Sequence, residues 1–119
     1  MSELKLGVVE ARFADIIWQN EPLSSNQLAK LAEQELSWKK STAYTILKRL
    51  CDRGIFQNRS GTVSSLISRE EFHALQSENF VNETFNGSLP AFVAAFGTRK
   101  KLSSAELDRL QSLIEQMRG

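Results

Sequence analysis

Apolar residues recur at intervals of three and four residues near the N-terminus. This spacing is typical of an amphipathic helix, and it predicts a first helix over residues 9–18. The expected apolar face consists of Val9, Phe13, Ile16 and Ile17. The pattern stops before Pro22, because proline disfavours helical geometry in the residue that precedes it.

A second helix is predicted over residues 25–35. Ser24 followed by Gln27 matches a capping box, in which the hydroxyl and the amide each satisfy a free backbone N–H. The side chains expected to be buried are Leu28, Leu31 and Ala32.

The third predicted helix carries the most unusual mixture of side chains. We expect Ser37 to cap it, and we expect it to run to about residue 53, because Gly54 fits the left-handed position that often ends a helix. Trp18 and Trp38 are expected to seal the small core beside these helices.

The segment IFQNRSGTVSSLI, residues 55–67, consists of two short β-compatible stretches around NRSG. We interpret it as a hairpin with its turn near Ser60 and Gly61. Three helices followed by a two-stranded wing form the winged version of the helix-turn-helix unit. The sequence therefore predicts a winged-helix domain over residues 1–67.

Residues 68–119 show a different pattern. Ser68 with Glu71, and Ser103 with Glu106, are two more capping-box candidates. Breaks at residues 86–88 and 97–101 divide the segment into three expected helices. Two of them have wide apolar faces, formed by Leu89, Phe92, Val93 and Phe96 and by Leu107, Leu110, Ile114 and Met117.

These apolar faces need a cover, since soluble monomers rarely expose a large apolar patch. A second copy of the chain would supply one through a two-fold, self-complementary interface. The alternative is that the three helices fold back on the winged domain of the same chain. The residues expected at a dimer interface are Phe80, Phe85, Leu89, Phe92, Val93, Phe96, Leu107, Leu110, Ile114 and Met117.

The predicted fold class is thus mainly α with a small β-hairpin wing. In it, a winged helix-turn-helix domain is followed by a helical dimerisation region over residues 68–119.

Positive charge is concentrated in one part of the chain. The whole sequence has 15 Lys and Arg against 14 Asp and Glu, a net charge of +1. Between Lys39 and Arg59, however, there are six cations and one anion, Asp52. A local cationic strip of this kind suggests an anionic partner.

The third helix separates its side chains by type when 100° is allowed for each residue. Ala43, Ile46, Leu47 and Leu50 fall within one arc, Ser41, Thr45 and Lys48 lie opposite, and Thr42, Tyr44 and Arg49 flank the outer face. Small hydroxyls, one aromatic ring and long cations suit the major groove of DNA. A basic surface helix without a partner is the simpler alternative.

Candidate DNA contacts follow from this arrangement, because recognition helices usually meet base edges near their N-terminal end. We assign base contacts to Ser41, Thr42, Tyr44 and Thr45, and either a base or a phosphate to Lys48. Lys39, Lys40, Arg49 and Arg53 are assigned to phosphates, which give affinity without sequence information. Arg59, near the hairpin tip, would reach phosphate or the adjacent minor groove.

Other classes of protein receive little support. With Cys51 and His73 as the single cysteine and histidine, no intramolecular disulfide, conventional zinc site or nucleophile–base pair is expected. Glu70, Glu71 and Glu78 are expected to be solvated charges, and no glycine-rich phosphate loop is present. We therefore expect no enzyme, cofactor or metal.

A membrane span would require an apolar run of roughly 20 residues, which the sequence lacks. The N-terminal residues show no secretory signal, so the cytoplasm is the expected location.

Four segments of the chain are similar to those of a known family. These are STAYTILKRLCDRGIF, SLISREEF, ARFADIIWQNEPLSSNQLAKL and GSLPAFVAAF. In them the chain resembles the BlaI, MecI and CopY family of penicillinase and copper-response repressors. This resemblance spans nearly the whole chain. It implies a winged-helix homodimer whose C-terminal helices form the dimer. It also implies a palindromic DNA operator, commonly with TACA and TGTA half-sites, and a homodimer that represses by keeping polymerase from the promoter.

The chain departs from the family pattern in three places. Antibiotic-responsive members are cut by a protease at an Asn–Phe bond, where this chain has Ala95–Phe96, so a regulatory protease stays an open question as a partner. The cysteine-rich tail of copper-responsive members is absent, which excludes copper sensing through that tail. The wing is about three residues shorter than is usual in the family, which predicts fewer DNA contacts by the wing.

The competing hypothesis is a winged-helix module that binds an acidic protein without sequence-specific DNA binding. A salt-insensitive protein interaction and no preference among DNA sequences would favour it.

Overall fold

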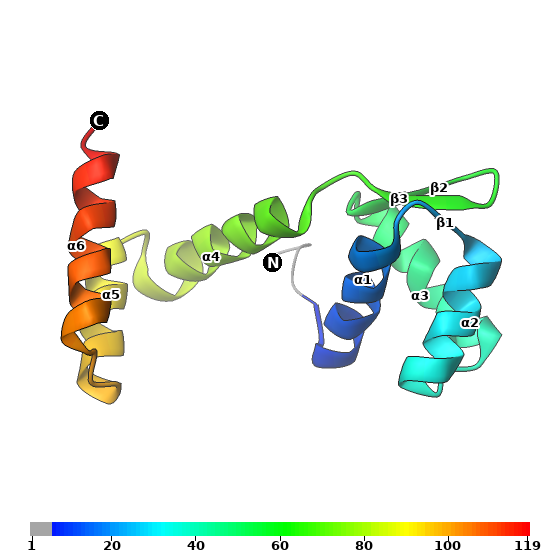
Figure 1. The fold of residues 1–119 in the computed structure, drawn as a ribbon, viewed down its shortest axis with the longest axis horizontal. Helices are drawn as coiled ribbons and strands as arrows, with labels where there is room; N and C mark the ends of the chain where they lie inside the picture. Colours follow the sequence, from blue (N-terminus) through cyan, green and yellow to red (C-terminus); the bar gives the residue numbers. More distant parts are fainter. Residues whose placement is uncertain (1–5) are drawn as a thin grey trace. The chain divides into compact units, whose positions relative to one another are not determined.

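The computed structural model describes residues 6–119, which divide into two compact units after Asn79. The elements, labelled in Figure 1, are α1 (Val8–Asn20), β1 (Leu23–Ser24), α2 (Ser25–Leu36), α3 (Lys40–Asp52), β2 (Phe56–Arg59), β3 (Thr62–Ser65), α4 (Arg69–Phe85), α5 (Leu89–Arg99) and α6 (Ser104–Met117). Only α4 belongs to both units.

The core of the first unit is closed by three helices and a small sheet. Figure 1 shows α1, α2 and α3 grouped together, with the hairpin of β2 and β3 beside them. Buried side chains from all three helices and the sheet form one cluster, which includes Phe13, Ile17, Leu28, Leu50, Ile55, Phe56 and Val63. Trp18 and Trp38 pack against this cluster as expected.

The sheet has one strand more than the sequence predicted. The β2–β3 hairpin turns at Ser60 and Gly61, both at positive φ, which confirms the predicted turn. In addition β1 pairs antiparallel with β3 and places Leu23 opposite Val63, giving the strand order β1-β3-β2. A strand of two residues is too short to show the alternation by which strands are recognised.

The capping box of Ser24 and Gln27 is confirmed at the start of α2. The prediction that Ser37 caps the third helix is wrong. Ser37 has a φ of 57° and ends α2, donating its N–H to the Glu33 carbonyl at 3.1 Å. The third helix instead begins after Lys39, whose side chain makes no capping bond.

Two details of the predicted core also differ. Val9 is exposed, while Ala14 is buried within the same helix. In α2, Leu31 is half-buried, and Ala29 is fully buried instead. Alanine is small and only weakly hydrophobic, so hydrophobic periodicity marks it less clearly than a large apolar side chain.

The second unit contains the end of α4 together with α5 and α6. Asn86 and Gly87, both at positive φ, separate α4 from α5, and Ser103 with Glu106 forms the predicted capping box of α6. The second expected break starts later than predicted, because α5 continues to Arg99. Neither α5 nor α6 has a buried residue.

The beginning of α4 belongs to the core of the first unit. Phe72 is 2% exposed and is part of the buried cluster, and Ser68 accepts a hydrogen bond from the Glu71 N–H at 3.1 Å. The structural division after Asn79 therefore lies within α4.

A single core substitution checks the packing of the first unit. Leu50 is fully buried, so Leu50→Ala should reduce the free energy of unfolding by about 3 kcal/mol through lost burial and a residual cavity. Leu66→Ala, at a side chain that is 54% exposed, should cost no more than about 0.5 kcal/mol. Urea unfolding followed by tryptophan fluorescence measures both, and equal losses would contradict the described core.

Candidate nucleic-acid interface

Helix α3 has one buried side and one open side. Ala43, Leu47 and Leu50 are buried and Ile46 is half-buried against the core. The side chains on the open side are all exposed, namely Ser41, Thr42, Tyr44, Thr45, Lys48 and Arg49. We call these six residues the α3 ridge. The structure thus places them together, as the helical spacing predicted.

Hydroxyls on the α3 ridge keep part of their hydrogen-bonding capacity. The Thr45 hydroxyl donates to the Ser41 carbonyl at 2.9 Å, within the helix. Because a hydroxyl also has two acceptor lone pairs, Thr45 still offers an acceptor and a methyl group to a partner.

Two cations of the ridge form ion pairs within the first unit. Lys48 Nζ lies 3.4 Å from Asp52 Oδ2, with both side chains largely exposed. Arg49 Nη1 lies 3.3 Å from Glu10 Oε2, and the other Glu10 oxygen accepts from the Gly7 N–H at 3.2 Å. Exposed pairs of this kind are weak, so a phosphate can compete for both cations.

The other cations differ in their surroundings. Lys39, Lys40 and Arg59 are exposed, and among residues 6–119 none of the three forms an ion pair. Arg53 is half-buried and already interacts with the protein. The most available basic side chains therefore lie at the start of α3 and at the hairpin.

The wing is short and is tied to the rest of the unit. The Gly61 carbonyl accepts from the Ser25 N–H at 2.8 Å, which joins the turn to the start of α2. At the other end of β3, the Glu21 carboxylate accepts from the Ser65 N–H at 2.7 Å and from its hydroxyl at 2.8 Å. Arg59 is the basic side chain that this hairpin exposes.

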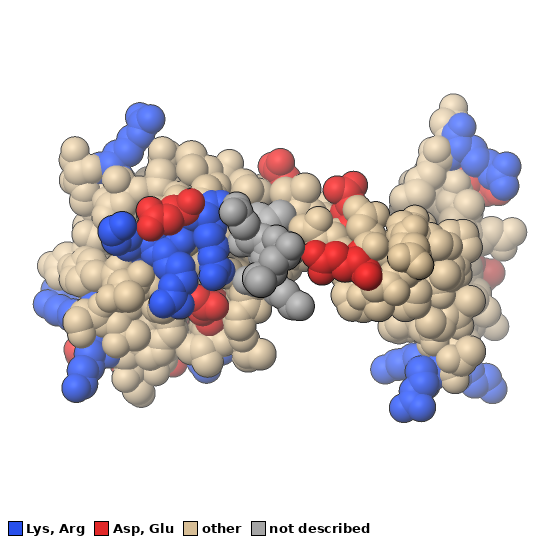
Figure 2. All heavy atoms as spheres, turned by 180° about the vertical axis from the view of Figure 1, so that it is seen from behind, with Lys and Arg blue, Asp and Glu red and all other residues tan. Residues whose placement is uncertain are grey.

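Charge on the first unit is mixed. Figure 2 shows one face of the molecule, on which blue Lys and Arg side chains gather over the first unit beside red acidic side chains. The ion pairs of Lys48 with Asp52 and of Arg49 with Glu10 partly neutralise the charge of these two cations.

Cys51 is the free cysteine, and it lies on α3 next to Asp52. Burial, and secondarily the negative charge of Asp52, raises the pKa of the Cys51 thiol. The thiol therefore stays protonated at neutral pH, which suits a packing role and not a nucleophilic one.

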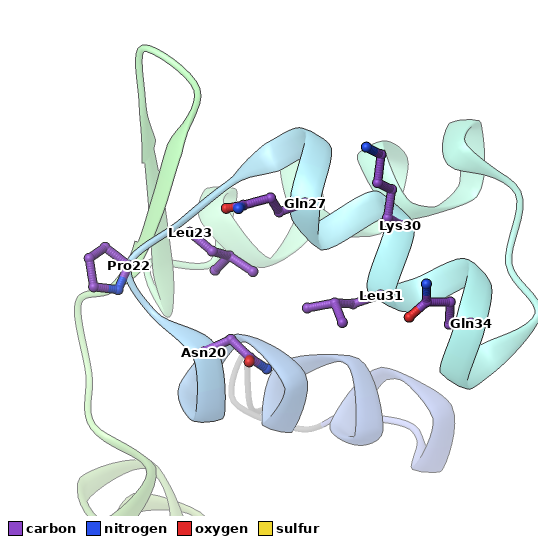
Figure 3. Close-up of a pocket in the computed structure, with 7 residues that line it drawn as sticks. All are labelled: Asn20, Pro22, Leu23, Gln27, Lys30, Leu31 and Gln34. Carbon is purple, nitrogen blue, oxygen red and sulfur yellow. The ribbon is translucent and has the colours of Figure 1, made fainter.

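A hollow of about 410 Å³ lies between α1, β1 and α2 (Figure 3). It is lined by Asn20, Pro22, Leu23, Gln27, Lys30, Leu31 and Gln34. Asn20 donates its amide to the Ile16 carbonyl, and the Gln27 carbonyl oxygen accepts from the Ser24 N–H. Both amides therefore form hydrogen bonds with the backbone of their own helix ends. None of the predicted site residues lines the hollow.

Within residues 6–119, no three or more His, Cys, Asp or Glu side chains lie together in a group that could hold a metal ion. In the same part of the chain, no helix has both the length and the apolar character to span a bilayer.

Comparison with known proteins agrees with this arrangement. The penicillinase repressor family matches residues 6–116. The chain belongs to the penicillinase repressor family. This confirms the resemblance seen in the sequence motifs.

One similar family member is the penicillinase repressor of Bacillus licheniformis. It is 25% identical over 111 residues, which cover 90% of this chain and 87% of that relative. Among solved structures, the solution structure of the DNA-binding domain of the repressor BlaI is similar, with a TM-score of 0.52 and 19% identity. That match covers 59% of this chain and 90% of the BlaI domain, and it supports the predicted winged-helix fold.

Sequence reasoning missed Glu10 as a contributor to the site. Its carboxylate holds Arg49 from a position 39 residues away in the chain. No periodic or local motif marks such a pair, although the capping-box position of Glu10 relative to Gly7 could have marked the residue itself.

Proposed function

We propose that this chain is a homodimeric, sequence-specific DNA-binding repressor that occupies a palindromic operator and keeps polymerase from the promoter. The observation that supports this function most strongly is the α3 ridge. Its hydroxyls, aromatic ring and cations are exposed, while the opposite side of the helix is buried. Membership of the penicillinase repressor family supports the same function.

Base readout is assigned to the N-terminal half of the ridge. Ser41, Thr42, Tyr44 and Thr45 would meet base edges in the major groove, where hydroxyls donate or accept and the threonine methyl contacts thymine. Lys48 would reach a base or a phosphate after leaving Asp52, a weak exposed partner.

Phosphate contacts are assigned to the surrounding cations. Lys39 and Lys40 are the first choice, because they are exposed at the start of α3 and carry no ion pair within residues 6–119. Arg49 and Arg53 would add to them by exchanging an internal contact for a phosphate. Arg59 would contribute least, since the Gly61–Ser25 bond holds the wing turn against α2.

A second copy of the chain is the proposed cover for the apolar faces of the second unit. Phe80, Leu89, Val93, Phe96, Leu107, Ile114 and Met117 are all exposed, by 39 to 70%. Phe80, Phe85 and Phe92 form an edge-to-face cluster in which Phe85 and Phe92 are half-buried. Beside it, a largely apolar hollow of about 240 Å³ is lined by Phe92, Val93, Phe96, Leu102, Glu106 and Leu110. Self-complementary packing would remove these surfaces from water.

The salt dependence of binding tests the function. On a duplex with TACA and TGTA half-sites, log Kd should change with log salt by about 0.9 per phosphate contact, or about 7 for a dimer making eight contacts. Lys40→Ala removes one proposed contact from each subunit, so the slope should fall by about 2. Lys30→Ala, at an exposed lysine of α2 outside the assigned DNA contacts, removes the same charge and serves as the matched control, with little change expected.

A scrambled duplex completes this experiment. Equal affinity for the scrambled and palindromic duplexes would contradict the proposal and would favour the protein-binding module. Equal slopes for Lys40→Ala and the unmodified protein would remove Lys40 from the phosphate contacts.

A charged substitution tests the proposed dimer. Ile114 is 48% exposed within one chain, so Ile114→Asp should leave the fold intact. In the dimer it would bury an unpaired carboxylate, which should weaken association by at least tenfold, or about 1.4 kcal/mol. Sedimentation equilibrium measures this, with Leu66→Asp in the first unit as the control. A monomeric unmodified protein would contradict the proposed dimer.

A further inference from the structure

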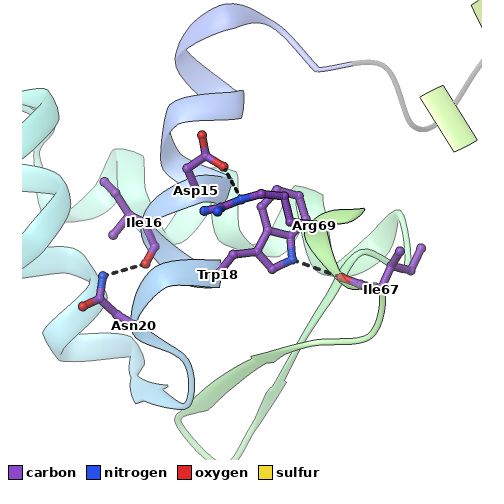
Figure 4. Close-up of polar contacts among 6 residues, drawn as sticks. All are labelled: Asp15, Ile16, Trp18, Asn20, Ile67 and Arg69. Atoms are coloured by element: carbon purple, nitrogen blue, oxygen red, sulfur yellow. Dashed lines mark hydrogen bonds and ion pairs between the residues drawn. The ribbon is translucent and has the colours of Figure 1, made fainter. Parts of the chain in front are cut away.

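Three side chains hold the start of α4 against α1. Arg69 Nε lies 3.0 Å from Asp15 Oδ1, and the guanidinium carbon of Arg69 lies 5.9 Å from the centre of the Trp18 ring. The Trp18 indole donates to the Ile67 carbonyl at 3.0 Å. Figure 4 shows these contacts between α1 and the residues around the start of α4. We call Asp15, Trp18 and Arg69 the α1–α4 clasp.

The clasp is anchored in the core of the first unit. The Trp18 ring lies 5.1 Å from Phe56 and 5.4 Å from Phe72, measured between ring centres. Both phenylalanines are buried, at 0% and 2% exposed. The first turns of α4 therefore cannot rotate or tilt without breaking the ion pair, the indole hydrogen bond and the packing of Phe72.

Local helix stability does not explain an arginine at this position. Arg69 is the first residue of α4, where the helix dipole disfavours a cation, and Glu70 and Glu71 already supply favourable negative charge. Arg69 Nη2 is also buried without a hydrogen-bond partner among the described residues, which is costly. The side chains of Arg69 and Asp15 are 35% and 49% exposed, so their ion pair adds little stability, and the geometry that Arg69 imposes explains it better.

The direction of α4 affects the proposed dimer interface, because α4 is one continuous helix. It runs from Arg69 to Phe85, so the helix that begins at the clasp also carries Phe80 and Phe85 of the proposed dimer interface. In a two-fold dimer on DNA, the separation of the recognition helices must match the separation of the half-sites.

We propose that the α1–α4 clasp fixes the direction in which α4 leaves the winged-helix unit, and that it thereby determines which spacing between two operator half-sites the protein accepts. Asp15 and Arg69 act as positioning residues, without touching DNA. This inference rests on the proposed function.

The inference is tested by measuring how strongly the protein prefers one spacing between the half-sites. Each base pair inserted between half-sites moves one of them by about 3.4 Å and rotates it by about 34°. The full chain is titrated with duplexes whose half-site spacing differs from the best one by one or two base pairs, and with a duplex that carries one half-site. The readout is the ratio of affinities for the best and the altered spacings.

Two single variants remove the ion pair. Asp15→Asn removes the negative charge, and Arg69→Gln removes the positive charge. The unmodified protein should bind the best spacing at least about tenfold more tightly than a spacing altered by one base pair. In both variants this ratio should fall below about threefold, with affinity for the single half-site unchanged within about twofold. Glu33→Gln removes one exposed negative charge from α2 and should keep the original ratio.

Trp18→Phe supplies an independent variant, since it keeps an aromatic ring and removes the indole donor to Ile67. It should also lower the spacing ratio. A ratio that stays unchanged in all three clasp variants would overturn the inference, because merely structural residues would alter stability without altering spacing preference.

The test separates the inference from the proposed function. A protein that prefers the palindrome to scrambled DNA but tolerates every spacing in its unmodified form overturns the clasp inference alone. A protein with no preference for the palindrome at all overturns the proposed function, and the inference with it.

Discussion

The burial of one side of α3 determines what its other side presents. Ala43, Leu47 and Leu50 are held in the core, at 0 to 3% exposed. Because a helix turns once every 3.6 residues, fixing these three positions directs the α3 ridge outward. The position of the candidate DNA-contacting side chains therefore depends on the hydrophobic packing of the first unit, and polar contacts such as Arg49–Glu10 adjust it only locally.

The two units use their apolar residues differently. The first unit buries a cluster of large apolar side chains within one chain, including Leu23 and Phe56 of the two outer strands and Phe72 of α4. The second unit arranges its rings edge to face but leaves every residue of α5 and α6 at least partly exposed. This difference supports the proposal that the first unit presents α3 to DNA and that the second unit forms the dimer.

Local features of the fold could be predicted from the sequence. The faces of α3, the capping boxes at Ser24 and Ser103 and the turn at Ser60 depend on residues within four positions of each other, so a single sequence contains the signal. The prediction failed at Ser37 because serine is common at helix starts and uncommon at the left-handed position that ends a helix, which Ser37 nevertheless occupies while its N–H donates to carbonyls of α2. Strand β1 forms only by pairing with β3, which lies some 40 residues later, so the local sequence does not predict it.

The contacts that orient the site could not be predicted from the sequence either, because they too join residues that are far apart in the chain. Glu10 with Arg49 and Asp15 with Arg69 join residues that lie 39 and 54 positions apart. Each of these residues looks like an ordinary surface charge in the sequence, and only the fold brings the pairs together. Family membership, in contrast, was visible from motifs spread over nearly the whole chain.

Selection of bound sequences from a random DNA pool tests the central claim most directly. The unmodified protein should select a palindrome, because two copies of the α3 ridge would read equivalent half-sites. Tyr44→Ala, at a ridge side chain that is 41% exposed, should relax the preference at one position in each half-site and leave the others intact. A pool without a palindrome, or an identical consensus for the two proteins, would contradict the account of how this ridge reads DNA.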